Sequence, residues 1–445
     1  MKESLEHGAE SKEQEARGME SLRRAPFIAI ACGGTGGHLF PGLAVAEELV
    51  GRGCAVGLLI SPKEVDRQAV KTVKGVEIHT LPAIAFQRGL RLAFIQGAWQ
   101  SWRAARKLFQ SRPPCAALAM GGFTSAPPIL AAKQAGAKTF LHESNTIPGR
   151  ANRWIARLVD QAFVGFPSAA TRLRVREATV TGTPVRSDFH PRDPAACRLA
   201  LGFDPARPVV LVMGGSQGAS GINDLMLAAL PLLTQRAPHW QWLHLTGSHD
   251  SDKVKQTYAA LGVKAAAHAF LAEMDLALGA ASAAVSRAGA SSLAELAAMR
   301  VPALLVPFPH AADNHQFCNA LAAAETGAAR LLEQKDATPW KVAGHLIELV
   351  ENAAARDTLK AALARWHAPN AAQQIAEIVL RAVGRSADND VRETASAVGG
   401  DDCGPTPNPS EGGEQTHGRK QTHARDATVP LLGGVRSGFV GQSDI

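Results

Sequence analysis

Two glycine-rich turns carry the residues of this chain that are best suited to chemistry. Gly33-Gly-Thr-Gly-Gly-His38 follows the apolar run Phe27–Cys32, and Gly214-Gly-Ser-Gln-Gly-Ala219 follows the run Val209–Met213. A buried strand that ends in a glycine turn and opens a helix directs backbone N–H groups at one point, where the helix dipole adds partial positive charge. Such a turn can hold a phosphate or a developing anion. Two turns at corresponding places predict two similar nucleotide-binding domains that face a shared cleft.

Polar side chains at the first turn could act on a substrate. Thr35 and His38 lie where the following helix begins. His38 could work there as a general base or as a donor to an oxyanion. The alternative is a structural glycine turn with an exposed histidine, and the local sequence leaves both interpretations open.

A third strand-to-helix transition runs from Ser286 to Glu295. Ala290, Ser291 and Ser292 place small and hydroxyl-bearing residues at the helix N-terminus, which suits a phosphate. Glu295, one turn further along, could accept two hydrogen bonds from a ribose diol. The alternative, which the local sequence favours, is a capping glutamate that reaches back to Ser291 or Ser292.

Further polar residues follow apparent strand ends, where open α/β sheets bind their ligands. Asp313 and Gln316 have side chains that suit sugar hydroxyls, although Asp313 could instead cap a helix. Asn145 and Arg186 could face the same cleft.

One pair of carboxylates raises the question of a metal. Asp250 and Asp252 match the acidic pair of many metal-dependent sugar transferases, but they also fit the opening of a helix with acidic residues, which we favour. The sequence contains no HExxH or CxxC arrangement that would support zinc. We therefore expect no metal site.

Length and composition limit the class of protein. A chain of 445 residues exceeds what one core usually supports and predicts two domains. No apolar stretch reaches the roughly 20 residues that span a bilayer, and the six scattered cysteines are typical of a reducing cytoplasm. The formal charge of +7 favours an anionic partner, and a single Tyr makes nucleic acid the least favoured one.

Strand and helix patterns alternate along the chain, which predicts the α/β class with parallel sheets covered on both faces. Pro41 is expected in the first turn of a helix that runs to Arg52. The expected organisation is a flexible leader over 1–24, a domain over 25–186, a linker over 187–207, a second domain over 208–385 and a disordered tail over 386–445.

Residues 84–109 contain both apolar and cationic side chains. This composition is typical of a protein surface that binds anionic lipid. The alternative is an ordinary helix that packs on a sheet and has a solvated basic face. We expect the helix over 95–109 to pack on the sheet and the preceding loop to face the membrane. The expected membrane-facing residues are Phe86, Arg88, Leu90, Arg91, Leu92 and Phe94.

Seven ordered motifs resemble those of one family, the MurG peptidoglycan glycosyltransferases, over about residues 25–380. They are Gly33–His38, Met120–Phe123, His142–Asn145, Gly182–Arg186, Gly214–Gly218, Ser286–Gly289 and Pro307–His310. The resemblance implies a GT-B architecture of two Rossmann-like domains around a central cleft. It implies inverting transfer of N-acetylglucosamine from UDP-N-acetylglucosamine to the muramoyl 4-hydroxyl of lipid I (undecaprenyl-diphospho-N-acetylmuramoyl-pentapeptide), which gives lipid II.

The same resemblance implies roles for single residues and for partners. His38 would assist deprotonation of the acceptor, without a tightly bound cofactor or metal. The protein would be peripheral on the cytoplasmic side of the cell membrane. Its partners would be lipid I, the anionic inner leaflet and other cell-wall synthesis proteins. Its activity would contribute to cell shape and cell division. The UDP-sugar site would comprise Thr35, Gly36, Gly37, Asn145, Arg186, Ser216, Leu271, Ala290, Ser291, Ser292, Leu293, Ala294, Glu295 and Gln316.

Other functions stay open as alternatives. A related glycosyltransferase with a diacylglycerol acceptor and a UDP-sugar epimerase share the expected fold. A non-catalytic UDP-sugar-binding module would be favoured by loss of His38, Glu295 or Gln316, and the chain has all three. A dinucleotide-dependent oxidoreductase does not fit, because the chain has GGTGGH and GGSQGA in place of a single GxGxxG unit.

Overall fold

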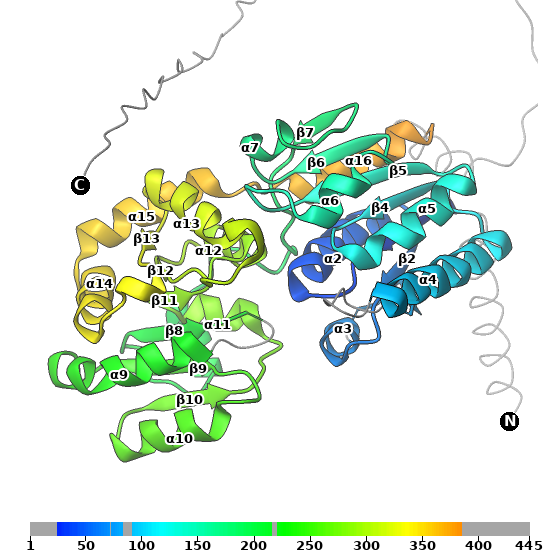
Figure 1. Ribbon diagram of the computed structural model, residues 1–445. Helices are drawn as coiled ribbons and strands as arrows, with labels where there is room; N and C mark the ends of the chain where they lie inside the picture. The colour runs from blue at the N-terminus through cyan, green and yellow to red at the C-terminus, as the bar shows by residue number, and fades with distance from the viewer. Residues whose placement is uncertain (1–24, 72, 83–90, 216–219, 385–445) are drawn as a thin grey trace, which may run out of the picture. The chain divides into compact units, whose positions relative to one another are not determined.

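The computed structural model describes residues 25–71, 73–82, 91–215 and 220–384, without the side chains of Glu64, Val65, Gln68 and Arg91. The predicted leader and tail lie outside the described residues, as do four predicted site residues, Phe86, Arg88, Leu90 and Ser216. The described part of the chain forms two Rossmann-like domains, each built on a parallel sheet (Figure 1). The predicted α/β class is confirmed.

Seven parallel strands form the sheet of the first domain, in the order β3-β2-β1-β4-β5-β6-β7. All five residues of β1 are buried, because helices cover the sheet on both faces and the strand therefore has a continuous apolar sequence. The strands are β1 (Phe27–Ala31), β2 (Ala55–Ile60), β3 (Val76–Thr80), β4 (Ala116–Ala119), β5 (Lys138–Glu143), β6 (Gln161–Val164) and β7 (Ala178–Val180).

Helices α2, α3 and α16 contribute to the core on one face of this sheet, and α4 to α7 contribute to the core on the other. Helix α16 comes last along the described chain, yet Ile375 and Val379 pack with α2 of the first domain. The helices are α2 (Gly36–Gly51), α3 (Glu64–Val70), α4 (Arg91–Ser111), η1 (Phe123–Ser125), α5 (Ala126–Gln134), α6 (Arg150–Ile155), α7 (Pro167–Ala170) and α16 (Ala371–Ala382).

Six parallel strands form the second sheet, in the order β10-β9-β8-β11-β12-β13. They are β8 (Val209–Met213), β9 (Gln241–Leu245), β10 (Ala265–His268), β11 (Ala283–Ser286), β12 (Ala303–Leu305) and β13 (Arg330–Leu331). Helices α11, α12 and α13 pack on one face, and α9, α10 and α14 on the other. The remaining elements are α8 (Pro194–Ala200), α9 (Ser220–Arg236), α10 (Ser251–Ala260), α11 (Met274–Ala280), α12 (Ala290–Met299), η2 (Ala312–Asn314), α13 (His315–Glu325), η3 (Gln334–Asp336), α14 (Pro339–Glu351) and α15 (Ala353–Trp366).

Each sheet has a point where the strand order reverses, and ligands bind there in open α/β sheets. In the first domain β1 and β4 are neighbours, and the helices after them, α2 and α5, cover opposite faces. In the second domain the same holds for β8 and β11, which are followed by α9 and α12. The topology therefore brings the first predicted glycine turn, and Gly214 and Gly215 directly after β8, to such a point.

The predicted start of the first helix is wrong. Helix α2 begins at Gly36, so Pro41 lies inside the helix and not in its first turn. Steric and backbone constraints explain why glycine occupies positions 33 and 34, just before this helix. A Cβ atom on Gly33 would come within 2.3 Å of the backbone nitrogen of Ser61, and Gly34 has a φ of +111°.

Candidate active site

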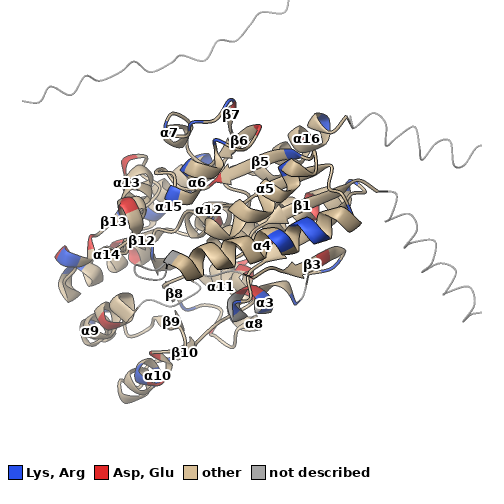
Figure 2. Ribbon diagram, turned by 45° about the vertical axis from the view of Figure 1, so that its right-hand side comes forward, with Lys and Arg blue, Asp and Glu red and all other residues tan. Residues whose placement is uncertain are grey.

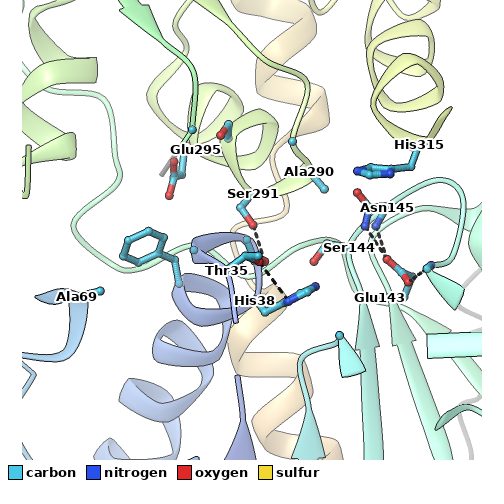
Figure 3. A pocket seen from close by; sticks show the side chains of 18 of the residues that line it. Thr35, His38, Ala69, Glu143, Ser144, Asn145, Ala290, Ser291, Glu295 and His315 are labelled. Atoms are coloured by element: carbon cyan, nitrogen blue, oxygen red, sulfur yellow. Dashed lines mark hydrogen bonds between the residues drawn. The ribbon is translucent and has the colours of Figure 1, made fainter. Parts of the chain in front are cut away.

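A cavity of about 540 Å³ is lined by both domains. The first domain contributes the glycine turn with the start of α2, part of η1, and the loop between β5 and α6. The second domain contributes residues after β8, the segment 269–272 and the first turns of α12. Figure 3 shows Thr35 and His38 below the cavity, with Ser291 and Glu295 on the opposite side.

Most predicted UDP-sugar residues in the described part of the chain line this cavity. Leu293 does not, because it is buried in the core of the second domain, and Ala294 is not part of the lining either. Gln316 also lies outside the lining, and its Oε1 accepts a 2.9 Å hydrogen bond from the backbone N–H of Phe308. The lining includes Thr35, Gly36, Gly37, His38, Asn145, Arg186, Leu271, Ala290, Ser291, Ser292 and Glu295.

His38 lies in the first turns of α2, with its ring against the backbone of Gly121 and Gly122. A Cβ atom on Gly121 would come within 2.9 Å of the His38 Nε2, so the position needs glycine. The His38 Nδ1 lies 3.3 Å from the hydroxyl of Thr35. Burial lowers the pKa of His38 to about 4, although the Asp66 carboxylate acts in the opposite direction. The ring is therefore neutral at pH 7 and can accept a proton.

Asp66 supports the glycine turn through a hydrogen bond to Gly34, although no pattern in the sequence predicts this role. Its side chain is buried, and its Oδ2 accepts hydrogen bonds from the backbone N–H of Gly34 at 2.8 Å and from the hydroxyl of Ser61 at 2.6 Å. The acidic residue stands in a short helix, α3, with no glycine or motif beside it. Only the folded chain brings it under the turn.

Glu295 of α12 and Arg186, which lies between β7 and α8, are two of the charged residues that line the cavity. Burial raises the pKa of Glu295 to about 7, and the positive charge of Arg186 acts in the opposite direction. The guanidinium of Arg186 lies between two rings, 5.1 Å from the centroid of Phe40 and 4.9 Å from that of Phe189. Arg186 is thus held in place by aromatic contacts.

The capping interpretation of Glu295 is wrong. Helix α12 begins at Ala290 after Gly289, and its first turn contains no acidic residue. Glu295 lies beyond the position from which a capping glutamate reaches back. Its carboxylate therefore does not cap α12, and Glu295 lines the cavity.

The loop after β5 is fixed by a buried carboxylate. The Glu143 Oε1 accepts hydrogen bonds from the backbone N–H and the Nδ2 of Asn145, both at 2.9 Å. The Glu143 Oε2 accepts bonds from the N–H of Gly149 at 2.9 Å and from the Nδ2 of Asn152 at 2.8 Å. Glu143 thus sets the course of the loop and the orientation of Asn145, as Figure 3 shows.

Asp313 does not cap a helix, so that interpretation is wrong too. Helix α13 begins at His315 with Asn314 before it. Asp313 forms ion pairs with Arg150, at 3.1 Å, and with Arg153 of α6 in the first domain. Hydrogen bonding and charge from Arg150 hold the pKa of the Asp313 carboxyl below its usual range. Asp313 therefore links the two domains at the edge of the cavity.

The remaining acidic pair lies at the start of α10. Asp250 directly precedes the helix and Asp252 is in its first turn, as the helix-opening interpretation predicts. The Asp250 Oδ2 accepts a 2.7 Å hydrogen bond from the Nδ2 of Asn223. Within the described ranges, no three His, Cys, Asp or Glu side chains gather in a way that could hold a metal ion.

The predicted membrane-facing loop is partly helix. Helix α4 begins at Arg91, so Arg91, Leu92 and Phe94 lie on its first turns. Its N-terminal half exposes apolar side chains, with Leu92 at 84%, Ile95 at 62% and Trp99 at 52%. Its other half packs on the sheet through Ala105 and Phe109, and Figure 2 shows Lys and Arg on its outer side. In the part of the chain that is described, no helix is both long and apolar enough to span a bilayer.

Comparison of the sequence with known protein families identifies the class of protein to which this fold and this site belong. Residues 28–164 match the glycosyltransferase family 28 N-terminal domain, and residues 209–375 match the glycosyltransferase family 28 C-terminal domain. The chain is thus a glycosyltransferase with the predicted GT-B architecture.

Individual relatives narrow the class. A UDP-N-acetylglucosamine–N-acetylmuramyl-(pentapeptide) pyrophosphoryl-undecaprenol N-acetylglucosamine transferase of Anaeromyxobacter dehalogenans is 34% identical over 376 residues, which cover 80% of this chain and 93% of the relative. The enzyme of the same name from a Synechococcus species is 41% identical over 314 residues, 69% of this chain and 83% of the relative. The crystal structure of Acinetobacter baumannii MurG aligns with a TM-score of 0.59 and 25% identity, over 80% of this chain and 99% of that one. The chain therefore belongs to the MurG family of these transferases.

Proposed function

We propose that this chain transfers N-acetylglucosamine from UDP-N-acetylglucosamine to the muramoyl 4-hydroxyl of lipid I, which yields lipid II for the cell wall. The observation that carries the proposal is a single cavity that joins a neutral His38 in one domain to the N-terminus of α12 and Glu295 in the other. Membership of a family named for this transfer supports it. None of the three relatives described above is named as an epimerase or as an enzyme with a diacylglycerol acceptor.

The donor would bind mainly to the second domain. The diphosphate would lie at the N-terminus of α12, where Gly289 lets it approach the free N–H groups of the first turn. Glu295 would accept hydrogen bonds from the two ribose hydroxyls, while Asn145 would contact the sugar from the facing domain. The positions of these residues around one cavity support the assignment.

The reaction would proceed by direct displacement. The 4-hydroxyl oxygen forms a bond to C1 of the donor sugar, the bond from C1 to the phosphate oxygen breaks, and the anomeric configuration inverts. The imidazole of His38 takes the proton of the hydroxyl, which its neutral state at pH 7 permits. UDP leaves with additional negative charge, which the N-terminus of α12 and the guanidinium of Arg186 stabilise.

We further propose that no tightly bound metal bridges the diphosphate. The reason is the positive potential that the chain itself supplies through α12 and Arg186, which both border the cavity. Transfer should therefore continue after treatment with a chelator such as EDTA. A loss of transfer that Mg²⁺ restores would contradict this part of the proposal.

The acceptor is anchored in a bilayer, so we propose that the first domain docks on the cytoplasmic face of the membrane. The exposed side chains of Leu92, Ile95 and Trp99 support a docking surface on α4, with Arg103 stacked 4.7 Å from the ring of Trp99. Of the membrane-facing residues expected from sequence, Arg91, Leu92 and Phe94 belong to this helix. Phe86, Arg88 and Leu90 stay predictions.

Sedimentation with vesicles of equal parts phosphatidylglycerol and phosphatidylcholine tests the docking surface. Leu92→Glu with Trp99→Glu should abolish binding to the vesicles and leave activity on a short-chain, water-soluble acceptor intact. Trp340→Glu is the matched control, because Trp340 is 64% exposed but belongs to the second domain. Equal binding by both variants, or loss of activity on the soluble acceptor, would show that α4 has another role.

The central test is transfer itself. Purified protein is incubated with labelled UDP-N-acetylglucosamine and a lipid I analogue, and the product is identified by mass and by the configuration of its new bond. We expect one added N-acetylglucosamine in β linkage. Label released without transfer, or epimerised donor, would favour the alternatives.

A further inference from the structure

A buried asparagine on α13 connects the two domains beside the cavity. The Asn319 Oδ1 accepts hydrogen bonds from the backbone N–H and the hydroxyl of Thr146, both at 2.9 Å. Its Nδ2 donates to the Oδ1 of Asn145 at 3.0 Å and to the carbonyl of Ala288 at 3.1 Å. Asn319 is 0% exposed, so water cannot take the place of these partners.

The orientations of the Asn319 and Asn145 side-chain amides follow from partners that can only donate or only accept a hydrogen bond. A backbone N–H can only donate, so Asn319 turns its oxygen to Thr146. A backbone carbonyl can only accept, so Asn319 turns its nitrogen to Ala288. The same nitrogen reaches the Asn145 oxygen, which leaves the Asn145 Nδ2 to donate to the Glu143 carboxylate. In this chain of hydrogen bonds, the partners therefore fix which atom of each amide donates and which accepts.

This chain of bonds joins two segments that the proposed function assigns to the donor. Asn145 lines the cavity from the first domain, and Ala288 directly precedes the Gly289 N-cap of α12. Asn319 does not itself line the cavity. With its bonds to Asn319 and Glu143 in place, the Asn145 amide keeps one N–H and one lone pair for a ligand.

We propose that Asn319 is a positioning residue for sugar transfer: it orients the Asn145 amide toward the donor sugar and ties the loop after β5 to the start of α12. The proposal rests on the proposed function, because the donor contacts of Asn145 and α12 belong to it. Asn319 acts through these residues and touches no substrate.

Asn319→Asp is the decisive variant. The aspartate has the same shape, keeps the oxygen that faces Thr146, and replaces the donating nitrogen by an oxygen. That oxygen would then face two other oxygens, those of Asn145 and Ala288, so the orientation of Asn145 is lost.

Gln241→Glu is a matched control at the other end of the second sheet. Gln241 opens β9 and is 1% exposed. Its Oε1 accepts from the N–H of Asp204 at 2.8 Å, and its Nε2 donates to the carbonyls of Asp204 at 2.9 Å and Arg207 at 3.2 Å. The control therefore makes the same amide-to-acid exchange against the same kinds of partner, away from the cavity.

Steady-state kinetics with a soluble acceptor, calorimetry with UDP and thermal unfolding are measured on both variants of the full chain. We expect both to lower Tm, but only Asn319→Asp to lower kcat/KM for UDP-N-acetylglucosamine, by at least tenfold. The Kd of UDP should change by a smaller factor than kcat/KM, since UDP lacks the sugar that Asn145 contacts. Equal effects of the two variants on kcat/KM, or an unchanged value in Asn319→Asp, would overturn the proposal.

Thr146→Val provides a second variant if Asn319→Asp fails to fold. It removes one of the two bonds to the Asn319 Oδ1 and keeps the size of the side chain. We expect a two- to tenfold fall in kcat/KM with an unchanged Kd of UDP, and no fall would refute the role of Asn319. Should the wild-type protein transfer no sugar, the proposed function has failed, and the Kd of UDP-N-acetylglucosamine in the same variants then decides on Asn319 separately.

Discussion

The hydroxyl of Ser291, in the first turn of α12, donates a 2.9 Å hydrogen bond to the backbone carbonyl oxygen of Gly37, in the first turn of α2. In a regular helix that carbonyl would accept a bond from the residue four positions on, but this residue is Pro41, which has no N–H. A proline in one domain thus leaves a carbonyl open to a serine of the other. The two helix N-termini meet through this bond at the cavity (Figure 3).

Ser291→Ala should destabilise the protein by about 0.5–1.5 kcal/mol, the usual net value of one hydrogen bond. The effect should depend on Pro41. In a Pro41→Ala background the new N–H of residue 41 can bond to Gly37, so the loss of Ser291 leaves the carbonyl with a partner. Thermal unfolding of the wild type, both single variants and the double variant measures this coupling. An equal effect of Ser291→Ala in both backgrounds would contradict the role given to Pro41.

The affinity for UDP-N-acetylglucosamine should rise with pH between 6 and 8. Burial raises the pKa of Glu295 to about 7, and the ionised carboxylate is the better acceptor for two ribose hydroxyls. Each unit below this pKa should weaken binding by up to about tenfold, because a proton must first leave. His38, with a pKa of about 4, stays neutral over this range.

Calorimetric titrations of the wild type and of Glu295→Gln at pH 6, 7 and 8 check this expectation. The glutamine cannot ionise, so the Kd of Glu295→Gln should be independent of pH. At pH 8 it should be larger than the Kd of the wild type. A wild-type Kd that does not change with pH would remove Glu295 from the ribose site.

The same carboxylate should lower stability as the pH rises. An unfolded glutamate titrates near 4.5, whereas folded Glu295 titrates near 7, so the folded state binds more protons between these values. The free energy of unfolding therefore falls as the pH increases through this window. The difference in Tm between Glu295→Gln and wild type (variant minus wild type) should therefore be larger at pH 8 than at pH 5. A Tm difference that is the same at both pH values would argue against the raised pKa.

Replacement of His38 by alanine should lower kcat by about 10²–10⁴-fold, the usual contribution of a general base, and leave the Kd of UDP within a few-fold. Because burial lowers the pKa of His38 to about 4, kcat of the wild type at saturating donor should stay level down to about pH 5. Measurement of kcat from pH 5 to 8 checks this. A tenfold decline per unit below pH 6.5 would indicate a histidine with an ordinary pKa.

Local sequence alone determined the elements that carry the site. The apolar runs of β1 and β8 and the glycines after them predicted two strand-to-helix turns, because hydrophobic burial and backbone sterics act between near neighbours in the chain. The motifs with Asn145 and Arg186, and the family resemblance in the case of Glu295, likewise predicted residues that line one cavity.

Only the tertiary structure decided which distant groups these residues meet. Asp313 resembles a helix cap in the sequence but pairs with Arg150 of the other domain, and Asn319 has no local signal at all. The last described helix, α16, shows an amphipathic pattern that does not tell which sheet it covers. A local pattern records what a residue needs, namely burial, a donor or an opposite charge. The partner that meets this need lies up to hundreds of positions away in the chain, and close packing of the folded chain selects it.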